Sequence, residues 1–421
     1  STNSSSSSSS PSRQNSKADK TTRRKIFLQF TRLLLKHLAS LESTSKSTSK
    51  STSTSTSTST KIIAEEEHEI GYIQSLKLQI PPLESVTSEF QQIEIYESKH
   101  YGKVFVLDEC LQLTEKDAPH YNEMLAHIPI MEYIIMSMNM KKQKRIGSET
   151  QTETRMDMKP LKVLVIGGGD GYVVAELLKH SFVESIDHVE LDQGVIDVSS
   201  DHFPWAKDLW KNEKVHLHIE DGAKFVQQKA NALSESESTS ESYGYDIIIQ
   251  DSSDPFFYED DGSLTILPSN VLYSDQHFQA LFQLLQPNDG ILMFQAETYN
   301  IPSNLEVIKE WRGTLDNIGF RNARYGTISI PTYPTGQIGF YVANARAADA
   351  NADTECTTDD KSSDGRTCIG NHSSSLLASE EFDMKTVTKY FEQMIGKTKY
   401  YHPKIHRSAF DLPLWVEEYI Y

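Results

Sequence analysis

Two carboxylates that stand three residues apart follow an apolar run and could hold or deprotonate an amine. The run is Ile247 to Ile249, and the acids are Asp251 and Asp254, with Pro255 behind them. Three apolar residues of this kind predict a buried strand, and ligands of open α/β sheets bind just beyond the carboxyl ends of strands. Such acids suit a cationic substrate, and one of them could accept a proton from an amine. They could also simply cap a turn by accepting from local N–H groups.

A glycine-rich turn upstream has the form of a nucleotide-binding element. The apolar run 163–166 leads into Gly167 to Gly171, and a helical pattern follows. In such strand–turn–helix units, glycines let the backbone approach a ligand at the helix N-terminus. The turn also carries an acid, Asp170. A single glycine-rich turn is weak evidence by itself.

Further acids end two more predicted strands. Glu190 follows a short apolar strand at a distance that suits a carboxylate accepting from ribose hydroxyls. Asp221 and Gly222 follow the run 216–220 in the same way. Each acid could instead be a loop residue or a helix cap. Three acids in order, all at strand ends, favour a nucleoside site.

Together these residues resemble those of the polyamine aminopropyltransferase family, and within it the spermidine synthases. The resemblance runs from about residue 90 to 342 and returns at 399–413. The matching motifs are the glycine turn 167–171, Glu190, Asp221-Gly222, Asp251 to Pro255, Val106-Leu-Asp108, the run 111–117, Tyr121-Asn-Glu123, Gln295-Ala-Glu297, the run 331–340 and the tail 400–413.

The resemblance implies transfer of an aminopropyl group from decarboxylated S-adenosylmethionine to putrescine, giving spermidine and 5′-methylthioadenosine. The donor's sulfonium already activates the attacked methylene, so we expect no metal and no cofactor; the donor is a co-substrate. Alignment of the two reactants can supply about 7–11 kcal/mol. Three alternatives stay open: spermine or thermospermine synthase with the same donor, a class I methyltransferase, and a binding protein without catalysis. Asp170 argues against the methyltransferase, because it would face the carboxylate of intact S-adenosylmethionine.

The resemblance also implies roles for individual residues. Asp251 would accept the proton of the attacking amine, Asp170 would hold the donor's ammonium, and Asp254 would hold the diamine. Gln112 and Gln295 are secondary candidates. The other residues expected around the donor nucleoside are Gln91, Glu190, Asp221, Gly222 and Pro268, and those expected around the amine are Tyr121, Asn122, Ser252, Ser253 and Tyr333.

Three departures from the family pattern leave the acceptor amine more open than the chemistry. Asn122 stands where the family usually has Gln or His, and the shorter amide could leave room for a water or a different amine. The loop 256–267 is longer and acidic. The region before Phe90 lacks the tryptophan common near the amine site.

The predicted fold class is α/β, with a Rossmann-like, class I methyltransferase-type sheet that is mostly parallel and a small N-terminal antiparallel β domain. Helices are predicted at 121–140 and 274–285. The predicted organisation is a disordered Ser/Thr-rich tail at 1–61, a β-strand domain at 62–118 and a catalytic domain at 119–421, with polar insertions at 141–158, 228–243, 256–267 and 345–381.

Composition bounds the partners. The chain has 421 residues, a net charge of −18 and three cysteines. This charge speaks against nucleic acid and agrees with cationic substrates, and so few cysteines argue against a disulfide framework. The basic segment 23–38 could be an organelle transit peptide or a short surface helix, and is too short and charged to span a membrane. We expect a cytoplasmic or organelle-targeted homodimer or homotetramer.

Overall fold

The computed structural model describes residues 59–69, 72–144, 158–235, 244–258, 264–287, 290–345, 388, 390–392 and 398–421. These belong to a compact unit that spans Thr58–Tyr421. The predicted tail up to residue 58, the segment 23–38 and nearly all of the insertion at 345–381 lie outside the described residues.

A seven-stranded sheet forms the centre of the unit, with the order β14-β15-β13-β10-β7-β8-β9. The five strands from β13 to β9 run parallel, whereas β15 runs antiparallel to both β13 and β14. This arrangement confirms the predicted mostly parallel sheet. The strands are β7 (Leu161–Gly167), β8 (Val183–Glu190), β9 (Val215–Ile219), β10 (Ile247–Asp251), β13 (Ile291–Ala296), β14 (Arg321–Ser329) and β15 (Gln337–Asn344).

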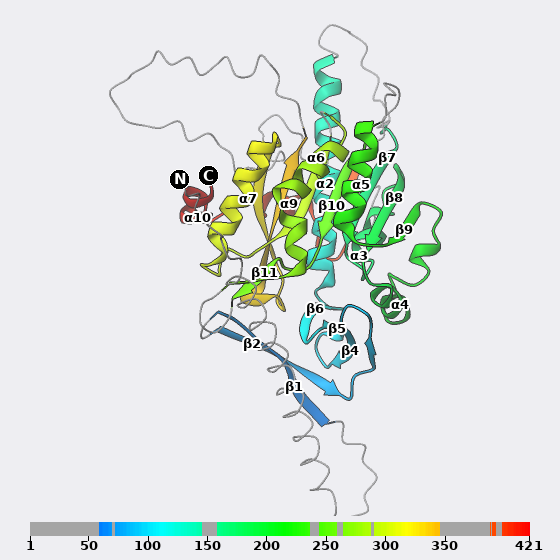
Figure 1. Cartoon of the computed structure of the whole chain (residues 1–421), viewed down its shortest axis with the longest axis vertical. Helices are drawn as coiled ribbons and strands as arrows, with labels where there is room; N and C mark the ends of the chain where they lie inside the picture. Colours follow the sequence, from blue (N-terminus) through cyan, green and yellow to red (C-terminus); the bar gives the residue numbers. More distant parts are fainter. Residues whose placement is uncertain are drawn as a thin grey trace, which may run out of the picture. The chain divides into compact units, whose positions relative to one another are not determined.

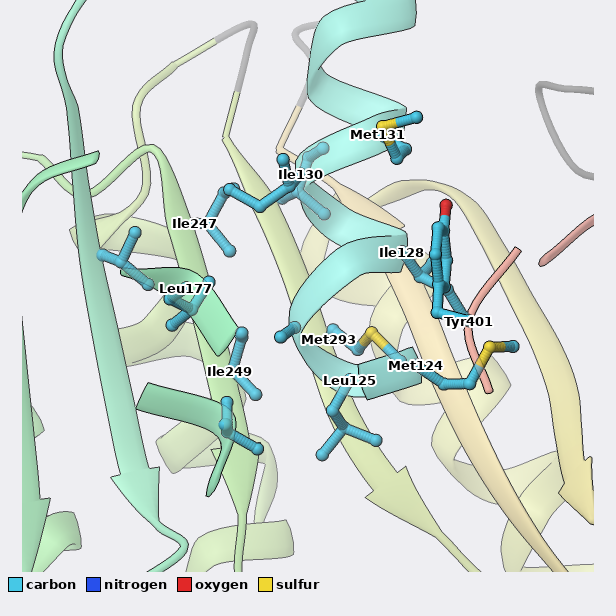
Figure 2. Close-up of a cluster of buried hydrophobic side chains, with 14 of the residues drawn as sticks. Met124, Leu125, Ile128, Ile130, Met131, Leu177, Ile247, Ile249, Met293 and Tyr401 are labelled. Carbon is cyan, nitrogen blue, oxygen red and sulfur yellow. The ribbon is translucent and has the colours of Figure 1, made fainter. Parts of the chain in front are cut away.

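Both faces of this sheet are covered, because its central strands are apolar on both sides. Ile247 and Ile249 of β10 pack against α2 (Ala118–Lys144) and α3 (Tyr172–Leu177), whereas Ile248 packs against the opposite layer. That layer contains α5 (Gly222–Glu235), α6 (Asp275–Leu284) and α7 (Asn304–Ile318). Figure 1 shows α5, α6 and α7 along one face of the sheet. Figure 2 shows the side chains of Ile247 and Ile249 on the side of β10 that carries α2 and Leu177.

The N-terminal strands are antiparallel, as predicted. β1 (Ser59–Glu69) pairs with β2 (Tyr72–Ile80), and a four-stranded meander follows. Val195 and Val198 of α4 (Gln193–His202) pack against Ile93 and Ile95 of this meander, so the small sheet shares a core with the larger α/β part. The meander consists of β3 (Glu84–Thr87), β4 (Gln92–Ser98), β5 (Gly102–Leu107) and β6 (Cys110–Thr114).

Several predicted boundaries were wrong. β1 begins at Ser59, inside the range predicted as tail. Helix α5 runs to Glu235, so residues 228–235 are helix rather than insertion; Ala230 is buried on the same helical face as Val226. Helix α2 continues to Lys144, beyond the predicted end at 140. The loop 256–267 contains a hairpin of β11 (Phe256–Tyr258) and β12 (Leu264–Ile266). The polar composition of these segments predicted loops, because local preferences are weak and tertiary context can override them.

A buried carboxylate of α2 binds the start of the C-terminal segment. The Glu123 carboxylate accepts hydrogen bonds from the backbone N–H groups of Lys399, Tyr400 and Tyr401, at 2.8–2.9 Å for the shortest contact of each. Two short helices follow, α9 (Pro403–Ser408) and α10 (Leu414–Ile420). None of the helices within the described ranges is both long and apolar enough to cross a membrane.

We expect Glu123→Gln to lower the free energy of unfolding by at least about 2 kcal/mol, because an amide NH₂ would face buried N–H donors that lose a charged acceptor. Urea denaturation measures this change. The matched control is Glu213→Gln, at an exposed position, which should stay within about 0.5 kcal/mol. Equal stability of the two variants would show that Glu123 does not anchor the C-terminal segment.

Candidate active site

The glycine turn after β7 lies directly against Asp251 at the end of β10. The parallel register pairs Asp251 with Gly167, whose φ is 77°. A Cβ atom on Gly167 would lie 2.0 Å from the Asp251 carbonyl oxygen, and one on Gly168 would lie 2.8 Å from the carboxylate Oδ2. Only glycine fits this approach. The predicted turn and the predicted acid therefore belong to one site.

Asp251 has a specific partner on helix α2. The Tyr121 hydroxyl donates a hydrogen bond to Asp251 Oδ1 at 2.7 Å. Burial raises the pKa of Asp251 to about 6, although the hydrogen bond from Tyr121 opposes that shift. A carboxyl with this pKa is mostly ionised at pH 7 and is a stronger base than an ordinary aspartate.

Two further acids stand at the neighbouring strand ends. Burial, together with the charge of Asp251, raises the pKa of Asp170 to about 8. Burial likewise raises the pKa of Glu190 to about 7. The turn also approaches Glu190, because a Cβ atom on Gly169 would lie 2.7 Å from its Oε2. Asp170, Glu190 and Asp251 thus form a cluster of carboxyls, here called the acid row, that a bound cation would stabilise.

Asp254 belongs to a second polar group on the far side of Asp251. Gln295 Nε2 donates to Asp254 Oδ1 at 3.1 Å, and the Tyr273 hydroxyl donates to Gln295 Oε1 at 2.6 Å. Ser252 Oγ donates to the same Tyr273 hydroxyl at 3.2 Å. The structure therefore brings Ser252, Asp254 and Gln295 together through Tyr273.

Glu297 completes this second group. It is 5% exposed, and the Tyr333 hydroxyl and Asn304 Nδ2 both donate to its Oε2, at 3.3 and 3.2 Å. Burial, followed by the charge of Asp254, raises the pKa of Glu297 well above its usual range. Asp254 and Glu297 are thus two acids that favour a shared proton or a bound cation.

The residues predicted for the nucleoside gather around the ends of β8 and β9. Gln91 Nε2 donates to Asp192 Oδ2 at 3.1 Å, and the Asp192 N–H donates to Glu190 Oε1 at 3.0 Å. Asp221 follows β9 and accepts from the N–H of Ala223 at 3.0 Å, so it also caps α5.

Gly222 and Pro268 are the other two residues predicted around the nucleoside. A Cβ atom on Gly222 would lie 2.7 Å from Ile166 Cγ2. Pro268 opens a short helical turn directly after Leu267, whose N–H donates to the Pro255 carbonyl at 2.9 Å. The loop that carries Pro268 is therefore fastened to the acidic signature that ends at Pro255.

Some predicted residues do not join these groups. Asn122 is buried, and its Nδ2 donates within α2 to the Ala118 carbonyl at 2.9 Å, while its Oδ1 accepts no hydrogen bond from the described residues. Gln112 Nε2 bonds the Cys110 carbonyl of its own strand at 3.3 Å. Ser253 is exposed.

Three residues of the site were missed from the sequence. Asp192 and Glu297 each follow a predicted site residue, Glu190 and Gln295, by two positions, and that spacing was an available signal. Tyr273 lies in a segment without any motif, so only the structure reveals its bonds. Among the described residues, no three His, Cys, Asp or Glu side chains form an arrangement that could hold a metal.

Comparison with known proteins identifies the family of this chain. A model of the spermine/spermidine synthase domain matches residues 118–353, and a model of the spermidine synthase tetramerisation domain matches residues 83–115. A polyamine aminopropyltransferase of Leptospira biflexa is 31% identical over 362 residues, covering 84% of this chain and 98% of the relative. A spermine synthase of Arabidopsis thaliana is 33% identical over 331 residues, covering 78% of this chain and 71% of the relative.

Solved structures show the same fold. The crystal structure of spermidine synthase from Thermotoga maritima covers 89% of this chain and 98% of its own, with a TM-score of 0.58 and 22% sequence identity. A spermidine synthase solved in complex with the transition state analogue AdoDATO has a TM-score of 0.59 at 23% identity. The methyltransferase-like sheet and the small antiparallel sheet are common to this fold. Given the domain match and the identity to these relatives, the chain belongs to the spermine/spermidine synthase family of polyamine aminopropyltransferases.

Proposed function

We propose that this protein is a spermidine synthase, which transfers the aminopropyl group of decarboxylated S-adenosylmethionine to putrescine. The observation that supports this most is the acid row at the carboxyl edge of the sheet, with Asp251 bonded to Tyr121. An active site with this many carboxyls suits two cationic substrates. The products are spermidine and 5′-methylthioadenosine, and the donor is a co-substrate, so we propose no cofactor.

The donor would lie along the β7, β8 and β9 ends of the sheet. Glu190 would accept from the ribose hydroxyls, and Asp170 would bind the ammonium of the aminopropyl arm. The remaining donor contacts would come from Gln91, Asp221, Gly222 and Pro268. Intact S-adenosylmethionine carries a carboxylate next to this ammonium, and the acid row would repel it.

The acceptor would lie between Asp251 and the second polar group. Asp254, with Glu297 and Tyr333 beside it, would hold the distal ammonium, and Asp251 would accept the proton of the attacking amine. The amine nitrogen then attacks the methylene carbon next to the sulfonium. The carbon–sulfur bond breaks, and its electron pair stays on sulfur. Tyr121 would keep Asp251 aligned with the amine.

A longer acceptor is the second candidate, which would make the protein a spermine or thermospermine synthase. Asn122 leaves this alternative open, because its amide is shorter than the family's usual side chain and bonds back into α2. Product identification distinguishes the two, with putrescine, spermidine and cadaverine offered separately to the same donor. We expect putrescine to give the highest kcat/KM. A higher value for spermidine would overturn the proposed acceptor and leave the aminopropyl chemistry intact.

We also propose a cytoplasmic homodimer or homotetramer with no nucleic-acid or membrane partner. The alternative location is an organelle, reached through the basic segment 23–38. The tetramerisation-domain match at residues 83–115 supports an oligomer. This range contains the whole meander of β3 to β6.

Asp251→Asn should lower kcat by at least about 10²-fold, because an amide cannot accept the proton of the attacking amine. The expected measurement is single-turnover transfer at pH 7, with the fold checked by circular dichroism. Asp201→Asn, an exposed acid of α4, is the control and should react like the wild type. Near-normal turnover of Asp251→Asn would exclude Asp251 as the proton acceptor.

Asp254→Asn should raise the KM for the amine more than it lowers kcat, because this carboxylate would bind the diamine away from the reacting nitrogen. Steady-state kinetics with the amine varied at saturating donor measures this ratio. The donor KM should change little. A loss confined to kcat would instead place Asp254 at the reacting centre.

Donor binding at pH 7 should release protons. Asp170, with its pKa of about 8, is mostly protonated in the ligand-free site, and a bound ammonium favours its ionised form. The release should shrink as the pH rises past about 8, because the carboxyl is then already ionised. Calorimetry in two buffers with different ionisation enthalpies measures it. Asp170→Asn should release fewer protons, and proton uptake by the wild type would contradict this assignment.

A further inference from the structure

The glycine turn is held from outside by a segment that joins α4 to β9, and this segment carries two tryptophans. Trp205 and Trp210 are both half-buried and lie within the run 203–211. Each indole N–H, which is a donor only, is used in a hydrogen bond that leads to the backbone of the turn. Neither tryptophan touches Asp251 or Glu190 through any bond described above, so their effect on the site would pass through the turn.

Trp210 acts through a buried histidine. Its Nε1 donates to Nδ1 of His188 at 3.0 Å, and His188 Nε2 lies 2.8 Å from the Gly167 carbonyl oxygen. Because Nδ1 accepts, the proton of the neutral ring must be on Nε2, from which it donates to Gly167. Burial lowers the pKa of His188 to about 4, so the ring stays neutral at physiological pH. The indole therefore selects the tautomer that can hold the turn.

Trp205 acts on the other end of the turn. Its Nε1 donates to the Asp170 carbonyl at 2.9 Å, and its ring stacks on Phe203, with ring centroids 4.7 Å apart. The same ring packs against Tyr172, the first residue of α3, at 4.7 Å. The backbone of the residue that would bind the donor's ammonium is thus fixed from outside the sheet.

The Trp210 ring also packs on the turn directly. A Cβ atom on Gly171 would lie 3.1 Å from Cζ2 of Trp210 and 2.7 Å from Cδ2 of Leu209. Gly167, Gly168 and Gly171 all have φ between 66° and 77°, and glycine is the residue with the greatest backbone freedom. A turn with this freedom needs outside contacts to keep one conformation.

We propose that Trp205, Trp210 and His188 are positioning residues, here called the indole clamp, that hold the glycine turn in the conformation required for donor binding. The clamp bonds the turn at Gly167 and at Asp170, on either side of the glycine that touches the Asp251 carboxylate. It preorganises Asp170 before the donor arrives, and so reduces the ordering cost of binding. The proposal rests on the proposed donor site at the turn.

The first test needs no ligand. Trp210→Phe keeps an aromatic ring but removes the N–H, so both His188 tautomers become accessible. We expect faster backbone hydrogen exchange in residues 167–172, with exchange elsewhere unchanged. Trp415→Phe is the matched control, since Trp415 is 53% exposed on α10. Wild-type exchange of the turn in Trp210→Phe would overturn the proposal, as would faster exchange across the whole protein, which would indicate a merely structural role.

The second test measures the donor. Trp210→Phe should raise the Kd of decarboxylated S-adenosylmethionine about 3- to 10-fold, as expected for the loss of one neutral hydrogen bond, and should leave the amine KM nearly unchanged. Trp205→Phe removes the hydrogen bond to the Asp170 carbonyl and should also raise this Kd. It keeps the proposal testable if Trp210→Phe folds poorly. His188→Leu should weaken the donor similarly, and His188→Gln, which keeps an N–H donor, should restore most of the affinity.

The results separate the clamp from the proposed function. A wild-type protein that does not bind the donor would refute the proposed function, and the exchange result would still decide whether the clamp orders the turn. Donor binding by the wild type together with equal Kd values for Trp210→Phe and Trp415→Phe would overturn the clamp alone. If His188→Gln bound the donor no more tightly than His188→Leu, the role of the His188 N–H in holding the turn would be overturned.

Discussion

The contact of the Gly167–Gly168 backbone with Asp251 is the constraint on which the rest of the site depends. The two strands that carry these residues are neighbours and run parallel, so the glycine turn and the acid emerge at the same edge of the sheet. Any side chain at either glycine would collide with Asp251. This close packing brings the donor's expected ammonium ligand, Asp170, within electrostatic reach of the expected base.

The concentration of acids has an energetic consequence for the ligand-free protein. Raised pKa values at Asp170, Glu190 and Asp251 mean that the folded state disfavours their ionisation. These carboxyls ionise normally in the unfolded chain. The contribution of each one to the free energy of unfolding therefore falls as the pH rises from about 4 toward its folded pKa. Cationic substrates would reverse this penalty. The same carboxyls that destabilise the empty site are therefore those that would select cationic ligands.

Rigid surroundings are needed to hold like charges together. Helix α2 supplies Tyr121 from its first turns, and it is buried along much of its length between the sheet and the C-terminal segment. Glu123, two residues further on, holds that segment through backbone bonds. The indole clamp would hold the turn in a corresponding way, through the hydrogen bonds of Trp205 and Trp210. The family match covers the helix that carries Tyr121, Asn122 and Glu123, and the Asn122 amide bonds back into that helix.

The sequence alone determined the parts of this protein that follow from local pattern. Apolar strands ending in acids or glycines predicted the parallel sheet and placed Asp251, Glu190 and Asp170 at its edge, because strand direction forces those ends together. The alternating run after Gln92 predicted the antiparallel unit. Tertiary structure decided what depends on contacts between distant segments: the burial that raises the pKa values, the hydrogen bond of Tyr121 and the roles of Tyr273, Glu297 and Trp210. It also decided where α5 ends, because the packing of Ala230 and Leu233 outweighs the weak helix preferences of the polar residues around them.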